Sequence, residues 1–175
     1  MIRVNDEILL KPLSKDDAQL IFDVLNEERE YMRVWLPFVD NTKEVRYTKD
    51  VVDKMLDSID KQYCIWHKDK FVGLIGFKGT DIGNRKTEIG YWLSQSAQGK
   101  GVMRQSVVKL IELAFDTLDM NRIQIKAAEG NLRSRNIPEK LGFVLEGIER
   151  DGELLVDDVF TDIVVYSLLK REYKA

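Results

Sequence analysis

The stretch "SQSAQGKGVMRQ", residues 94–105, joins the apolar run "IGYWL" to the amphipathic run "SVVKLIELAF". The first run is typical of a strand and the second of a helix, which predicts a strand-to-helix loop between them. The first turn of a helix carries backbone N–H groups without intrahelical acceptors, and the helix dipole adds positive potential there. Gly99 and Gly101 would let an anion such as a phosphate approach this backbone. Lys100 and Arg104 would add positive charge.

The spacing of the glycines excludes two familiar phosphate loops. The string lacks the G-x-x-x-x-G-K-[ST] pattern of a P-loop, and Arg104 stands where a dinucleotide fingerprint requires its third glycine. Glycines that serve only the geometry of a turn are an open alternative at this point. The residues alone therefore predict either another kind of phosphate cradle or a tight turn.

The composition is that of an ordinary globular domain. The chain has 175 residues, of which 44% are hydrophobic and 33% charged, so residues 1–175 are predicted to form a single domain. A net charge of −3 gives no basic footprint for nucleic acid. The sequence has no apolar run of about 18 residues and no signal-peptide layout at its start, so we expect a cytoplasmic protein without a membrane span.

The chain contains one cysteine and one histidine, Cys64 and His67, in the strand-like run "QYCIWHK". A single cysteine forms no internal disulfide, which is typical of a reducing compartment. We expect Cys64 to be a small core residue. With no second histidine or cysteine, neither a zinc site nor a Cys–His pair is predicted.

Periodicity predicts the order strand, helices, three strands, helix, strand, helix and two strands. Ser14 and Asp17 resemble a capping box at the start of the first helix. The expected helices cover about 15–28, a short segment ended by Pro37, 44–60, the run after the glycine loop, and 134–141. The expected strands are 7–13, 62–68, 71–79, 86–93, 121–128, 143–153 and 159–169. Consecutive antiparallel strands exclude a purely parallel doubly wound sheet and favour a mixed sheet with helices on its faces.

A family resemblance extends this interpretation. "YWLSQSAQGKGVM", residues 91–103, resembles the acetyl-CoA-binding segment of the GNAT N-acetyltransferases, whose signature is Q/R-x-x-G-x-G/A. Gln98 and Gly101 match the signature, and Met103 replaces its last small residue. "AAEGNLRSRNIPEKLGF", residues 127–143, looks like the family's second cofactor segment. The order of elements agrees across nearly the whole chain.

The resemblance implies a particular fold and a branch of the family. The GNAT fold is α+β (mixed α/β), with a mostly antiparallel seven-stranded mixed sheet, helices on both faces, and a splay between its two central parallel strands. The chain is most similar to the Rim-type branch, which acetylates ribosomal-protein N-termini, through "YMRVWLPFVD" (31–40) and "IPEKLGFVLEG" (137–147). It departs from its relatives at Gln95, where many have proline, and at Phe160, where tyrosine is expected.

The cofactor that the resemblance implies is acetyl-CoA, with no metal. In the family the pyrophosphate lies on backbone N–H groups that here belong to Gln98, Gly99, Lys100, Gly101, Val102 and Met103. The pantetheine arm lies in the splay, where its implied partners are backbone groups of Trp92, Leu93 and Ser94. Asn131 is expected to hydrogen-bond this arm through its side chain. A turn residue after Gly130 is the alternative role for Asn131.

The implied reaction is direct attack of a neutral amine on the acetyl carbonyl, with coenzyme A leaving. An α-amino group has a pKa of about 7.7–8.0, against about 10.4 for lysine, so a larger share of α-amines is neutral near pH 7. An N-terminal acceptor therefore needs only a modest base and correct positioning. A strand N–H near Leu93 is expected to polarise the carbonyl.

Two side chains match the working pair of the Rim-type branch. Glu153, in "RDGELL", matches a glutamate proposed as general base, and Ser134 matches a serine that would give a proton to the departing thiolate. Ser134 as a helix cap and Glu153 as a solvated surface charge are the alternatives, and Glu88 is another candidate base. The acceptor groove is expected to be walled by Trp35, Leu36 and Phe38. Core packing is the alternative for these three residues.

The leading prediction is an acetyl-CoA-dependent N-acetyltransferase that modifies the N-terminal amine of a ribosomal protein. The same chemistry on a small amine, such as a polyamine, an amino acid or a drug, is the alternative, and a non-catalytic acyl-CoA-binding module is the third. Neither nucleic acid nor a membrane is an expected partner. The resemblance also implies a homodimer or larger homo-oligomer, in which "VVYSLL" (164–169) would lie either at the interface or in its own core.

Overall fold

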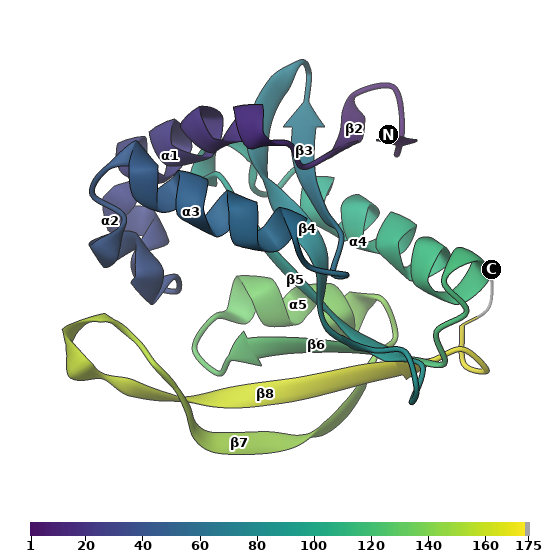
Figure 1. The fold of residues 1–175 in the computed structure, drawn as a ribbon. Helices are drawn as coiled ribbons and strands as arrows, with labels where there is room; N and C mark the ends of the chain where they lie inside the picture. Colours follow the sequence, from purple (N-terminus) through teal and green to yellow (C-terminus); the bar gives the residue numbers. More distant parts are fainter. Residues whose placement is uncertain (174–175) are drawn as a thin grey trace.

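The computed structural model describes residues 1–173 and contains a mixed sheet with helices on both faces (Figure 1). The strands are β1 (Ile2–Arg3), β2 (Ile8–Pro12), β3 (Gln62–His67), β4 (Lys70–Asp81), β5 (Lys86–Leu93), β6 (Arg122–Ala128), β7 (Val144–Leu154) and β8 (Phe160–Leu169). The α-helices are α1 (Ala18–Glu27), α2 (Arg29–Met32), α3 (Val45–Leu56), α4 (Val102–Glu112) and α5 (Leu132–Lys140). The predicted α+β class is confirmed.

The strand order across the sheet is β1-β2-β3-β4-β5-β6-β8-β7. Every described neighbouring pair is antiparallel except β5 and β6, which are parallel. The described sheet has eight strands where seven were expected, because Ile2 and Arg3 pair with β2. A strand of two residues is too short to produce a recognisable period in the sequence.

The parallel strands β5 and β6 pair only over their first residues. The register runs Lys86 to Arg122, Thr87 to Ile123 and Glu88 to Gln124, and no pairing follows. β5 nevertheless continues to Leu93 and β6 to Ala128. The two strands therefore diverge after Glu88, which confirms the predicted splay.

Two apolar clusters hold the helices on opposite faces of the sheet. α1 and α3 share one cluster with β3 and β4, which includes Ile21, Val52 and the thiol residue Cys64. α4 contributes Val107, Leu110 and neighbouring residues to the other cluster, against which α5 packs. Figure 1 shows α1 and α3 on the side of the sheet away from α4. Burial raises the pKa of the Cys64 thiol, as expected for a core cysteine.

The last strand is buried within its own chain. Residues 163–168 of β8 are all buried, between β6 and β7. Of the two placements considered for this strand, the structure supports burial in its own core. The oligomeric state stays a prediction.

Local signals in the sequence predicted one helix boundary correctly and another wrongly. The backbone N–H of Ser14 donates to the carboxylate of Asp17 at 2.8 Å, which confirms the predicted capping box. The prediction that Pro37 ends a helix is wrong, because α2 already ends at Met32 and Pro37 begins a 3-10 turn. Proline suits a first helical position, where its missing N–H costs nothing.

Candidate active site

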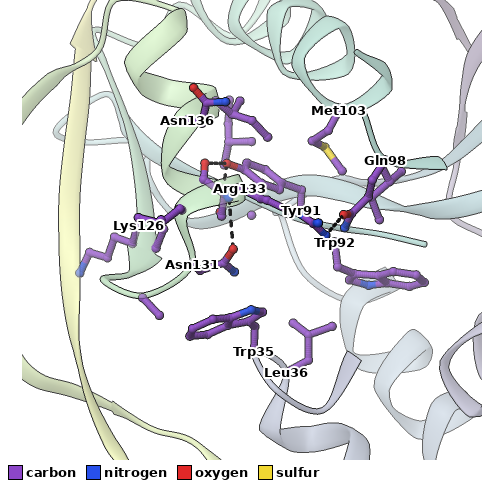
Figure 2. A pocket seen from close by; sticks show the side chains of 18 of the residues that line it. Trp35, Leu36, Tyr91, Trp92, Gln98, Met103, Lys126, Asn131, Arg133 and Asn136 are labelled. Atoms are coloured by element: carbon purple, nitrogen blue, oxygen red, sulfur yellow. Dashed lines mark hydrogen bonds between the residues drawn. The ribbon is translucent and has the colours of Figure 1, made fainter. Parts of the chain in front are cut away.

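An open cavity of about 1350 Å³ lies beside the splay (Figure 2). Its walls come from β5, the glycine loop and the start of α4, from β6 and α5, from the segment after α2, and from β7. The sheet and its connections bring these distant segments together. Gln98, Asn131, Ser134, Glu88 and Glu153 all line the cavity.

The glycine loop ends in a row of backbone donors. Gly99 and Gly101 have φ angles of 72° and 74°, in the left-handed region that favours glycine, and Gly101 is the N-cap of α4. The N–H of Gln105 donates to Gly101 O at 3.1 Å, so intrahelical bonding begins there. The N–H groups of residues 99–104 have no acceptor among residues 1–173. This geometry is that of an anion-binding helix start.

The donor row differs by one residue at each end from the predicted set. The N–H of Gln98 donates to Gln95 O at 3.2 Å and is therefore engaged. The N–H of Arg104 is unpaired among the described residues, because Arg104 belongs to the first turn of a helix that begins at Val102. The sequence signal that could have added Arg104 to the predicted donors is its place in the first turn of the helix expected after the glycine loop.

Polar side chains brace the loop against neighbouring elements. The side chain of Gln98 donates to the Tyr31 hydroxyl and accepts from Arg133 Nη1 at 2.6 Å. Lys100 Nζ donates to Ser96 O at 2.8 Å, and Lys100 does not line the cavity. The loop is therefore fixed from both α2 and α5.

The backbone of β5 faces alternate neighbours along its length. The N–H of Ser94 donates to Val72 O at 2.7 Å, so the backbone of Ser94 is directed toward β4, and that of Trp92, two residues earlier, has the same direction. Because successive strand residues direct their backbone groups to opposite sides, Leu93 and Tyr91 face the splay. Of the three predicted backbone partners, only Leu93 faces the splay. Tyr91, which was not predicted, also faces it.

Ser94 has a bracing role instead. Its hydroxyl donates to Glu28 Oε1 at 2.5 Å, and the N–H of Gln95 donates to Glu28 Oε2 at 2.8 Å. Glu28 lies at the junction of α1 and α2. A carboxylate 66 residues away in sequence thus holds the start of the glycine loop.

Asn131 and Ser134 lie in the first turn of α5, facing the splay. Asn131 is the N-cap, and its side-chain oxygen accepts from the N–H of Ser134 at 3.2 Å. Its amide group points into the cavity (Figure 2). Ser134 is not the cap, and its hydroxyl donates to the Tyr91 hydroxyl at 3.4 Å. Asn131 thus has the alternative role considered for it, a place in the local turn, while it also lines the cavity; its hydrogen bond to the pantetheine arm stays a prediction.

Glu153 reaches the cavity from β7 because of an irregularity in that strand. Glu149 pairs with Ile163 and Glu153 with Thr161, so β7 contains two more residues than β8 over this stretch. Gly152 lies in the irregular stretch, where a Cβ would come within 2.8 Å of Ile163 Cγ1. Residues of this irregular stretch, Glu149, Gly152 and Glu153, line the cavity.

Burial is the main influence on the pKa of Glu153, and two neighbouring charges modify it. Loss of hydration raises the pKa of Glu153, the nearby cation of Lys78 opposes the rise, and the carboxylate of Glu88 adds to it. Glu153 keeps a solvent-exposed surface and also lines the cavity. Glu88 forms an ion pair with Lys78 at 2.8 Å, whereas Glu153 has no ion-pair partner among residues 1–173.

Of the three residues predicted to wall the acceptor groove, two line the cavity and one does not. Trp35 and Leu36 line the cavity below Asn131 (Figure 2). The Trp35 ring lies so close to Gly130 that a Cβ on this glycine would be 3.0 Å from Trp35 Cη2. Phe38 does not line the cavity, and its side chain is largely exposed.

Tyr91 is a further site residue that the sequence interpretation missed. Its ring lines the cavity, and its hydroxyl donates to the backbone oxygen of Ser134 at 3.1 Å. An aromatic residue inside an apolar run gives no signal that its hydroxyl will meet a helix 43 residues away.

The described residues contain no cluster of three or more metal-ligating side chains. In the same part of the chain, no helix is long and apolar enough to cross a bilayer.

Comparison with known proteins places this site in a family. Residues 7–144 match the acetyltransferase (GNAT) domain. YdaF of Bacillus subtilis (strain 168), provisionally named a ribosomal N-acetyltransferase, is 34% identical over 98% of this chain and 96% of its own. The ribosomal-protein-serine acetyltransferase of Escherichia coli (strain K12) is 26% identical over 95% of this chain and 94% of its own.

A solved structure gives the same result. The microcin C7 self-immunity acetyltransferase MccE, in complex with acetyl-CoA and AMP, superposes with a TM-score of 0.90. It is 26% identical and covers 96% of this chain and 95% of its own. The match to the domain and the shared fold agree with the splay and the glycine loop described above: the chain belongs to the GNAT acetyltransferase family.

Proposed function

We propose that this enzyme transfers the acetyl group of acetyl-CoA to the N-terminal α-amine of a ribosomal protein. The observation that carries the proposal is the arrangement of one continuous cavity. A helix start with unpaired N–H groups lies at one part of its wall, unpaired strand edges line its middle, and carboxylates from β5 and β7 line another part. The relatives named for ribosomal-protein acetylation support the choice of acceptor.

Each part of acetyl-CoA has suitable partners in the cavity. The unpaired N–H groups of residues 99–104 would hold the diphosphate. The backbone groups of Leu93 and Tyr91 would pair with the amides of the pantetheine arm as a neighbouring strand would. The amide group of Asn131 remains available to donate to the same arm.

Glu153 is the better of the two candidate bases. Glu88 is already neutralised by Lys78, whereas the Glu153 carboxylate has no cation bound to it among the described residues. The raised pKa of Glu153 also makes it a stronger proton acceptor than an ordinary glutamate. The choice of Glu153 rests on these two differences.

In the proposed reaction, the amine displaces coenzyme A from the acetyl group. The amine nitrogen forms a bond to the acetyl carbon and loses a proton to Glu153, directly or through water, while the carbon–sulfur bond breaks. The leaving sulfur takes the proton of the Ser134 hydroxyl, and solvent returns the proton of Glu153 to Ser134. The products are the acetylated amine and the thiol of coenzyme A, and the enzyme is unchanged.

The test is intact-mass analysis of candidate acceptors after incubation with acetyl-CoA. Purified ribosomal proteins and a panel of small amines (polyamines, amino acids and aminoglycosides) would be compared at equal amine concentration. We expect a gain of one acetyl group on the N-terminal residue of a ribosomal protein. Preferential acetylation of a small amine would replace the proposed acceptor. Binding of acetyl-CoA without transfer to any acceptor would contradict the catalytic proposal.

A further inference from the structure

The hydroxyl of Tyr91 connects the two sides of the splay. Tyr91 belongs to β5 and lies three residues after Glu88, the last residue of β5 that pairs with β6. Its hydroxyl donates to the backbone oxygen of Ser134 at 3.1 Å and accepts from the Ser134 hydroxyl at 3.4 Å. Where backbone pairing between β5 and β6 has ended, this side chain ties β5 to the first turn of α5. Figure 2 shows Tyr91 lying alongside that turn.

The two contacts differ in strength and therefore in role. A length of 3.1 Å is close to an ordinary hydrogen bond, so the contact with the carbonyl fixes the position of the Ser134 backbone. A length of 3.4 Å exceeds the usual range for two hydroxyl groups, so the contact between the side chains is weak. Such a contact can orient the Ser134 hydroxyl and still release its proton to a better acceptor.

The phenol is suited to this role because it stays neutral. Burial of its hydroxyl raises the pKa of Tyr91 to about 12, against a smaller opposing effect of Ser134. At neutral pH the group therefore keeps the proton that it donates to the Ser134 carbonyl. Its oxygen remains an acceptor for the second contact.

We propose that Tyr91 is a positioning residue that holds the Ser134 hydroxyl in place to donate to the departing sulfur. The inference rests on the proposed role of Ser134 in the transfer reaction. Tyr91 itself does not need to touch the reacting atoms. It fixes the backbone of Ser134 and limits its hydroxyl to orientations facing the splay.

The test is a double-mutant cycle of Tyr91→Phe and Ser134→Ala. Thiol release from acetyl-CoA would be measured with a synthetic peptide that begins with serine. We expect Ser134→Ala to lower kcat by roughly 100-fold, the lower range for loss of a general acid. Tyr91→Phe should lower kcat roughly tenfold with less than a twofold change in the KM for acetyl-CoA. Because Tyr91 acts through Ser134, the double variant should be no slower than Ser134→Ala alone.

Three outcomes would overturn the inference. The first is an unchanged kcat in Tyr91→Phe. The second is a kcat in the double variant that falls by the product of the two single effects. The third is a Tyr91→Phe variant that changes only the KM for acetyl-CoA. Tyr63→Phe is the matched control, because Tyr63 is also partly buried in the sheet but lies outside this cavity. It should keep the wild-type kcat.

A crystal structure of Tyr91→Phe gives a readout that needs no acceptor. We expect the Ser134 side chain to leave its present rotamer or to occupy several. An unchanged Ser134 in that structure contradicts the positioning role. A wild-type enzyme that releases no thiol with any amine contradicts the proposed function instead, so the two failures are distinguishable.

Discussion

At the scale of single residues, Gly101 shows what the proposed phosphate cradle would require. Its φ of 74° costs a side-chain-bearing residue conformational energy, and Gly101 is the N-cap of α4, whose first turn lines the cavity. A Cβ at this position would lie 3.4 Å from the side-chain nitrogen of Gln105, which is ordinary contact. The backbone conformation, rather than crowding within the protein, therefore explains the glycine.

Gly101→Ala should destabilise the protein by about 1 kcal/mol, because alanine is strained at positive φ. It should also weaken acetyl-CoA binding by roughly tenfold or more, because the methyl group enters the space beside the N–H donors. Urea unfolding and calorimetric titration measure the two effects. Gly147→Ala is the control, since Gly147 has negative φ and a Cβ there would meet no atom within 4 Å. Normal acetyl-CoA affinity in Gly101→Ala would argue against the cradle.

The ionisation of Glu153 makes a second prediction at this scale. Its pKa is raised, so wild-type kcat should rise with pH through a value above that of an ordinary glutamate as the base form appears. Glu153→Gln should lower kcat by roughly 100-fold or more and remove this acidic limb. Acetyl-CoA affinity should not change. Steady-state kinetics from pH 4.5 to pH 9 would measure both changes, and an unaltered profile would place the base elsewhere.

At the scale of elements, an ion pair spans the middle strand of the order β6-β8-β7. Arg122 on β6 contacts the carboxylate of Glu146 on β7, which also accepts from the buried Ser167 of β8 at 2.8 Å. The Arg122 guanidinium, and then the Ser167 hydroxyl, lower the pKa of Glu146 to about 2. The pair links the three strands that carry α5 and Glu153.

The stability contributed by Glu146 should depend on pH in a defined direction. A carboxyl whose pKa falls from 4.5 to about 2 on folding stabilises the protein above pH 4.5, and the contribution is lost between pH 4.5 and 2. Because the pair is partly exposed, we expect Glu146→Gln to cost about 1 kcal/mol at pH 7. Chemical unfolding at pH 7, 4 and 3 should show the difference shrinking. A constant difference across these pH values would contradict the assignment.

The sequence predicted elements well where local periodicity is strong. The span 86–93 of β5 and the start of α4 follow directly from the apolar patterns on either side of the glycine loop. The two extra residues of β7 had no such signal, because they are defined by pairing with another strand. The contacts of Glu28 with the loop and of Tyr91 with Ser134 also depend on distant segments. The candidate site was therefore predicted in its motifs but not in the contacts that hold them.

At the scale of the whole molecule, the splay leaves the sheet continuous at one end and open at the other. Only three residue pairs join β5 to β6, so the halves β1–β5 and β6–β8 share few backbone contacts. Side chains such as Tyr91, Gln98 and Arg133 supply further links across the cavity. A ligand in the splay would contact both halves and bind the folded state alone.

Acetyl-CoA should therefore stabilise the complete fold. At a concentration of 100 times its Kd, a ligand specific for the native state adds about 2.7 kcal/mol. For a chain of this length, that corresponds to a rise in Tm of roughly 5–10 °C. Acetyl-pantetheine lacks the diphosphate and should give a much smaller rise at equal concentration. Equal shifts in differential scanning fluorimetry would mean that the helix start contributes nothing to binding.

The most direct test of the central claim is a crystal structure of the complex with acetyl-CoA. We predict diphosphate oxygens within about 2.7–3.2 Å of the backbone nitrogens of residues 99–104. The pantetheine arm should lie in the splay and pair with the backbone of Leu93 and Tyr91. The thioester should then lie between Ser134 and Glu153. A cofactor bound elsewhere, or a diphosphate held only by side chains, would contradict the account.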